Sequence, residues 1–218
     1  MKKNHKNINI LVGITGGISS YKSCELVRLF IKSGYSIKVM MTESATKFVS
    51  PLVFQELSQN PVYVNMFQEK GVDPFYQEKG VDPFYQEKGV DPFFIQHISL
   101  SQWADICLIA PTSANTLSKI ACGICDNLLT TVVLALGENK KVLFVPAMNE
   151  NMWKNPIIVD NVKKLKGTNL PAGKAGKYFI MPPQKGELAC GVYGEGRMPE
   201  PKDIYKLVVQ ILRKKDEG

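Results

Sequence analysis

The 218-residue sequence has no long hydrophobic run. A membrane-spanning helix needs about 20 consecutive apolar residues, and no stretch of this chain approaches that length. The N-terminal segment MKKNHKN is not followed by the hydrophobic core of a signal peptide. We therefore expect a protein of the cytoplasm that has no membrane partner.

Cysteine and histidine are also scarce. Five cysteines in a chain without a signal peptide argue against a disulfide framework. Cys122 and Cys125 form a CxxC motif, but no second CxxC or nearby histidine completes a zinc site, so we predict that the pair packs in the interior and that no metal is bound. Of the two histidines, His5 lies in a polar tail. His97, taken alone, is more typical of a structural residue than of a catalytic one.

A shortage of acidic residues leaves the chain with a formal net charge of +7. Much of the excess lies near the two ends, at Lys2, Lys3, Lys6, Arg213, Lys214 and Lys215. Basic tails are usually solvated, and no basic stripe alternates with aromatic residues, so we expect no nucleic-acid partner. The remaining composition, 44% hydrophobic and 22% charged, is typical of one globular domain spanning residues 1–218.

The chain does contain an alternation of apolar strands and amphipathic helices. Strands are predicted at 8–15, 36–42, 61–65, 105–110, 142–145 and 178–181. Helices are predicted before Gly34, from Glu43, from Pro51 and from Ser113, and at about 126–136, 152–165 and 203–214. This order predicts an α/β fold with a single doubly wound, mostly parallel sheet and helices on both faces, either flavodoxin-like or Rossmann-like.

Three segments stand apart from this alternation. A nine-residue unit, QEKGVDPFY or QEKGVDPFF, occurs three times in succession across residues 68–94. Each copy carries Gly and Asp-Pro, so we interpret the repeat as a turn-rich loop. Residues 167–177 are a second, smaller insertion. Residues 183–201 are rich in Gly and Pro without a strand or helix pattern, which predicts a flexible flap over a substrate.

Polar residues follow three of the predicted strands, in the segments GGISS, PTSANT and PAMNENM. The carboxyl ends of parallel strands line the ligand crevice of such a sheet, and helix N-termini there favour an anionic phosphate. The first segment is neither GxGxxG nor a P-loop, so a mononucleotide such as a flavin is favoured over NAD or ATP. Asn149 would lie at this edge, either in the chemistry or as a helix cap.

Five motifs in this order, GITGGISSYK, HISLSQWAD, PTSANTLSKIACG, PAMNENMW and ACGVYGEGRM, resemble those of the flavin-containing cysteine decarboxylases. The resemblance covers about residues 8–205 and is strongest to the members that act on phosphopantothenoylcysteine in coenzyme A biosynthesis. It implies a flavodoxin-like fold, bound FMN, and homotrimers or trimers of trimers with the flavin at a subunit interface. Many bacterial relatives are fused to a synthetase domain, which we expect here as a separate protein.

The resemblance also implies roles for individual residues. His97 resembles the catalytic histidine, Asn149 the residue that binds the substrate carboxylate, and Cys190 the acid of the flap; Met152 and Ala189 fall beside the substrate. The expected FMN contacts are Gly16, Gly17, Ile18, Thr42, Ser44, Ser113, Ala114, Asn115, Thr116 and Ala147.

Direct loss of CO2 from a cysteinyl carboxylate would leave a carbanion with no electron sink. The chemistry that the resemblance implies avoids this intermediate. FMN oxidises the cysteinyl thiol, decarboxylation gives an enethiolate, and hydride and proton are then returned. Two alternatives stay open: a decarboxylase of peptides that end in cysteine, and a non-catalytic flavin-binding subunit of the same fold. The joint presence of His97, Asn149 and Cys190 argues against the second alternative.

Overall fold

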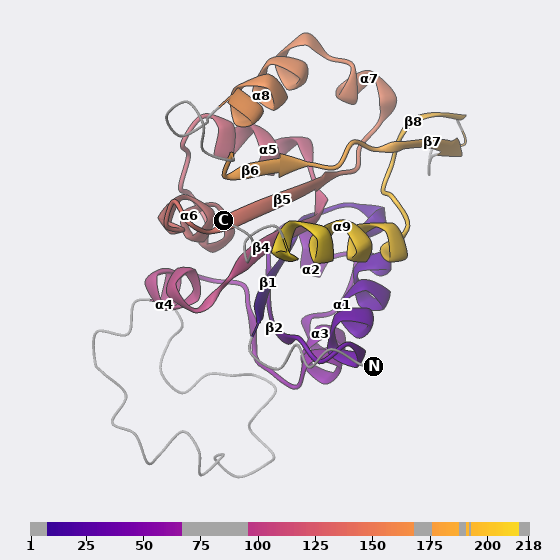
Figure 1. The fold of residues 1–218 in the computed structure, drawn as a ribbon. Helices are drawn as coiled ribbons and strands as arrows, with labels where there is room; N and C mark the ends of the chain where they lie inside the picture. Colours follow the sequence, from indigo (N-terminus) through magenta and orange to yellow (C-terminus); the bar gives the residue numbers. More distant parts are fainter. Residues whose placement is uncertain (1–7, 67–95, 168–175, 188–190, 192, 214–218) are drawn as a thin grey trace, which may run out of the picture.

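The computed structural model of the protein describes residues 8–66, 96–167, 176–187, 191 and 193–213 (Figure 1). The repeat at 68–94, most of the insertion at 167–177, and two residues of the expected site, Ala189 and Cys190, lie outside these ranges.

A six-stranded parallel sheet with the order β3-β2-β1-β4-β5-β6 forms the centre of the fold. Its strands are β1 (Asn9–Ile14), β2 (Ser36–Met41), β3 (Val62–Tyr63), β4 (Ile106–Thr112), β5 (Lys141–Pro146) and β6 (Tyr178–Ile180). Strands β1, β4 and β5 are almost wholly buried, as expected for a parallel sheet covered on both faces. The strand order runs outward in both directions from β1 and β4, which confirms the doubly wound α/β fold.

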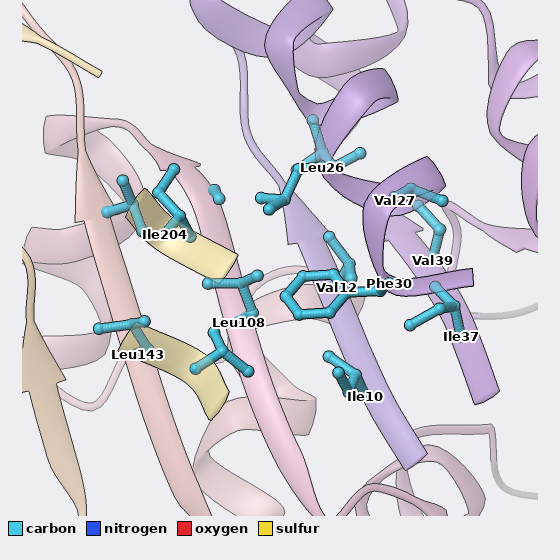
Figure 2. Close-up of a cluster of buried hydrophobic side chains, with 14 of the residues drawn as sticks. Ile10, Val12, Leu26, Val27, Phe30, Ile37, Val39, Leu108, Leu143 and Ile204 are labelled. Atoms are coloured by element: carbon cyan, nitrogen blue, oxygen red, sulfur yellow. The ribbon is translucent and has the colours of Figure 1, made fainter. Parts of the chain in front are cut away.

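Helices cover both faces of the sheet. One face carries α1 (Lys22–Lys32), α3 (Pro51–Ser58) and α9 (Pro201–Arg213), and Figure 2 shows Phe30 and Ile204 of this layer over Val12 and Leu108. The other face carries α4 (Gln96–Trp103), α5 (Ala114–Ala121), α6 (Leu128–Ala135) and α8 (Pro156–Gly167). The 3-10 turn η1 (Ile18–Tyr21) and the short helices α2 (Glu43–Thr46) and α7 (Glu150–Trp153) follow strands directly. At Gly34, φ is +86°, so the glycine ends α1 in the conformation that its position predicts.

Three local predictions were wrong. Pro111 does not end β4, because the strand continues to Thr112 through a shift in its register with β5, where a missing N–H is tolerated. The helix expected at 152–165 is two helices, α7 and α8, with Pro156 at the start of the second. The 183–201 segment is not patternless, because β7 (Gln184–Glu187) and β8 (Tyr193–Arg197) pair as an antiparallel hairpin.

Candidate active site

Hydrogen bonds join the carboxyl ends of β1 and β4, the two strands at which the sheet order reverses. Thr15 is fully buried, and its hydroxyl donates to the Pro111 carbonyl at 2.9 Å. The same hydroxyl accepts a hydrogen bond from the Ser113 backbone N–H at 2.7 Å. One threonine side chain therefore fixes the first segment, GGISS, against the second, PTSANT.

The neighbouring strand ends are held in the same way. The Thr112 hydroxyl accepts from the Val145 N–H at 3.1 Å, and the Thr112 carbonyl accepts from the Ala147 N–H at 3.1 Å. On the other side, the Thr42 N–H donates to the Ile14 carbonyl at 2.9 Å. The segments after β2, β1, β4 and β5 thus form one continuous edge. The sequence predicted that three of them, those after β1, β4 and β5, would meet there.

Glycines shape the first part of this edge. A Cβ on Gly16 would lie 2.6 Å from the Cβ of Ser44, so only glycine lets the segment after β1 contact the segment after β2. A Cβ on Gly17 would meet nothing within 4 Å. Gly16 and Ser44 therefore pack together, and open space remains beside Gly17.

Two helices begin at this edge with hydroxyl caps. The Ser113 hydroxyl accepts from the Thr116 N–H at 3.3 Å at the start of α5, and the Thr42 hydroxyl accepts from the Ala45 N–H at 3.3 Å at the start of α2. The first turn of α5 contains no acidic residue, so its amides and hydroxyls present a donor set without negative charge. Such a set suits a phosphate group.

Asn149 lies at the carboxyl end of β5 and caps α7. Its side-chain oxygen accepts from the Asn151 N–H at 2.8 Å, so the capping interpretation is confirmed. The cap limits the rotation of the Asn149 amide, because Oδ1 is held toward the start of α7. Ala147 is half-buried just before Asn149, and Met152 of α7 is 47% exposed.

The β7–β8 hairpin lies against this same segment. The Met148 N–H donates to the Gly196 carbonyl of β8 at 3.0 Å. Figure 1 shows the hairpin beside α7, away from the centre of the sheet. Glu150 and Gly194 also take part in this contact. They lie in the motifs PAMNENMW and ACGVYGEGRM, but 44 positions separate them and the motifs do not indicate that the two residues meet.

His97 lies on α4, which is not one of the segments that form this edge. It is the second residue of α4, and α4 ends at the amino-terminal edge of the sheet, where the Asn9 side chain donates to the Trp103 carbonyl at 2.9 Å. Figure 1 shows α4 and α7 on opposite sides of the sheet. Within the described residues, Asn149 thus follows a strand end that is joined to the segments after β1 and β4, whereas His97 belongs to a helix outside this edge.

The cysteines differ in their surroundings. The prediction that Cys122 and Cys125 pack in the interior was wrong, because both thiols are exposed in the turn after α5. Cys107 is fully buried in β4, and burial raises the pKa of its thiol to about 12.

Among the described residues, no group of three or more His, Cys, Asp or Glu side chains could hold a metal ion. Within the same residues, every helix is too short or too polar to cross a membrane.

Comparison with known proteins places the chain in a family. A family model described as Flavoprotein matches residues 1–213. A Streptococcus mutans protein named "Probable phosphopantothenoylcysteine decarboxylase" is 37% identical over 93% of this chain and 98% of its own length. The "Coenzyme A biosynthesis bifunctional protein CoaBC" of Borreliella burgdorferi is 36% identical over 97% of this chain but only 46% of its own length. This chain thus spans about half of the bifunctional relatives that it matches.

The fold is also similar to that of solved structures. A "PPC decarboxylase" mutant "complexed with pantothenoylaminoethenethiol" superposes with a TM-score of 0.73 at 29% identity, covering 95% of this chain and 99% of that one. "The FMN binding protein AtHal3" gives a TM-score of 0.70 at 30% identity, covering 95% and 98%. The family match and the sequence relatives together show that this chain belongs to the Flavoprotein family.

Proposed function

We propose that this protein is an FMN-dependent decarboxylase that converts 4′-phosphopantothenoylcysteine to 4′-phosphopantetheine in coenzyme A biosynthesis. The observation that carries the proposal is the edge at which Asn149 is held beside the segments after β1 and β4 by the hydrogen bonds of Thr15 and Thr112. The Streptococcus mutans relative, which this chain matches over nearly its whole length, supports the substrate.

The residues at this edge fit FMN. The open space beside Gly17 and the donor set at the start of α5 suit a flavin phosphate next to the β1–β4 switch point. The residues that would hold it are those expected from the sequence: Gly16, Gly17, Ile18, Thr42, Ser44, Ser113, Ala114, Asn115, Thr116 and Ala147. Once bound, FMN supplies the electron transfer by which the cysteinyl thiol is oxidised and its product later reduced.

Asn149 would orient the substrate. Its Oδ1 is held by the Asn151 N–H at 2.8 Å, which limits the orientations that the amide can take toward a ligand. An amide N–H donor directed at a carboxylate fixes the bond that breaks relative to the cofactor without adding charge. Met152, exposed one turn along α7, would contribute apolar contact to the same substrate.

Two further residues would move protons. His97 would act before or during the loss of CO2, and Cys190 of the flap would supply the final proton to the enethiolate. A thiol with an ordinary pKa near 8.5 is a competent acid for that step. Both roles are taken from the family resemblance. The resemblance also implies that Ala189 contacts the substrate.

We further infer that the enzyme is a homo-oligomer, a trimer or an assembly of trimers. The position of α4 supports this inference, because Figure 1 shows the helix that carries His97 well apart from α7, the helix that Asn149 caps. His97 would then reach the site of a neighbouring chain. We also propose that the reaction takes place in the cytoplasm, and that the synthetase activity that precedes it resides outside this domain.

The test is purification followed by two measurements. Denaturation should release about one flavin mononucleotide per chain, and the purified protein should release CO2 from 4′-phosphopantothenoylcysteine. A peptide ending in cysteine serves as the competing substrate. A protein that stays colourless after FMN is added would contradict the flavin proposal. Turnover of the peptide alone would instead assign the chain to peptidyl-cysteine decarboxylation.

A further inference from the structure

Glu150, the residue after Asn149, is the starting point of a contact that the proposed chemistry does not use. Its carboxylate accepts a hydrogen bond from the backbone N–H of Glu195 in β8. The carboxylate also forms a salt bridge with Lys154, whose Nζ lies 2.6 Å from Glu150 Oε1. Glu150 thus joins α7 to a strand 45 positions away along the chain.

The strand is shaped to receive this carboxylate. A Cβ on Gly194 would overlap Glu150 Oε2 and lie 2.8 Å from Cδ. These side-chain atoms are held from two directions, by Lys154 and by the Glu195 N–H, so they have little freedom to move aside. Glycine at 194 therefore permits the close approach on which the hydrogen bond depends.

A second hydrogen bond and a set of charges support the same contact. The Met148 N–H donates to the Gly196 carbonyl at 3.0 Å, two residues along β8 from Gly194. Lys185 of β7 pairs with Glu195 across the hairpin, and its positive charge acts on Glu150. The negative carboxylate of Glu150 is therefore stabilised by two positive charges, that of Lys154 in its own helix and that of Lys185 in the hairpin.

We propose that Glu150 is a positioning residue that holds the β7–β8 hairpin against the segment containing Asn149. The carboxylate binds β8 directly, and Gly194 makes room for it. The position of the hairpin beside Asn149 is thereby set by the residue next to Asn149 itself. The link to catalysis rests on the proposed function, whereas the contact between Glu150 and β8 does not.

Hydrogen exchange of the full chain tests the contact without any turnover. In Glu150→Ala, the amides of β8 and of Met148 should exchange roughly threefold to tenfold faster than in the unaltered protein, the range expected for an exposed, charge-assisted hydrogen bond. Glu150→Gln should give a smaller increase, because it keeps an acceptor and loses the charge. The matched control is Asp160→Asn, which breaks an exposed pair with Lys163 in α8 and should leave β8 unchanged.

Two more variants separate hairpin docking from helix stability. If Glu150 only stabilised α7, Lys154→Met would have the same effect on β8 as Glu150→Ala; we expect a clearly smaller one. Gly194→Ala should also speed exchange. Gly186→Ala, at the position of β7 that pairs with Gly194, should increase the exchange rate less. The added Cβ at 186 would meet only the flexible Arg197 side chain, at 3.1 Å.

A pH series adds a readout that general loosening would not give. The Lys154 hydrogen bond and the Glu195 N–H both lower the pKa of Glu150, and Lys185 adds to this. As the pH falls through that lowered pKa, the carboxylate is protonated and the unaltered protein should come to exchange as Glu150→Gln does. Unchanged β8 exchange in Glu150→Ala would overturn the proposal, whether or not the protein proves to be a decarboxylase. Flavin release measured on the same samples tests the proposed function separately.

Discussion

At the scale of single residues, Asn149 carries the sharpest expectation. Asn149→Asp would place a negative charge opposite the carboxylate of the proposed substrate, and like charges at close range repel each other. Asp is as good a helix cap as Asn, so α7 should be retained. We expect decarboxylation to be lost while flavin release stays at the unaltered level. Turnover retained at neutral pH would remove Asn149 from the proposed site.

The cysteines allow a second test at this scale. Burial raises the pKa of Cys107 to about 12, so its thiol stays protonated at neutral pH and is out of reach of reagents. Cys122 and Cys125 are exposed. Brief alkylation of the native protein, followed by peptide mass spectrometry, should modify these two and spare Cys107. In denaturant, all three should react. Labelling of Cys107 in the native protein would contradict its burial in β4.

The sequence predicts some residues of the site better than others. Asn149 could be placed because it follows an apolar run and precedes a helix, and both are local signals. The contact between Glu150 and Gly194 could not, because it depends on a hairpin docking onto a distant loop. Burial of Cys122 was predicted wrongly because the apolar residues around the CxxC suggest packing, whereas the turn after α5 faces outward.

At the scale of elements, the buried parallel strands were predictable because each is a short apolar run bounded by turn residues. The hairpin was missed for the opposite reason. The sequence of β7 is QKGE and that of β8 is YGEGR, and neither alternates apolar with polar residues. Beyond its pairing with β7, β8 is held at Gly194 by Glu150 and at Gly196 by Met148. The chain that leads from β8 into α9 is held separately, by Lys22 of α1.

That second attachment gives a prediction about stability. Lys22 of α1 is 11% exposed; its ammonium lies 3.0 Å from Glu200 Oε1 and donates to the Met198 carbonyl at 3.4 Å. Lys22→Met should lower the free energy of unfolding by about 0.5–1 kcal/mol, since Arg197 still pairs with the half-exposed Glu200. Urea denaturation measures the change. Lys206→Met, which breaks an exposed pair with Asp203 in α9, is the control and should change it by less.

At the scale of the whole molecule, the sheet order decides which residues can meet. Segments that follow β1, β4 and β5 meet at one edge because these strands are neighbours and parallel. A helix that precedes β4 must instead end at the opposite edge, which is where Trp103 contacts Asn9. The order of the motifs does not indicate how far apart α4 and α7 lie. The motifs of His97 and Asn149 look like parts of one site in the sequence, whereas Figure 1 shows α4, which carries His97, well apart from α7.

The separation makes the proposed oligomer testable by mixing two inactive variants. If each site takes Asn149 from one chain and His97 from its neighbour, His97→Asn and Asn149→Asp chains that are unfolded and refolded together should regain activity. A site is intact only when both contributing chains supply the right residue, so random assembly at equal amounts should restore roughly a quarter of normal turnover. The two variants refolded separately and then combined are the control, and they should stay inactive. Failure of the mixed oligomers to release CO2, with assembly confirmed by light scattering, would place both residues in a site within one chain, or His97 outside the site.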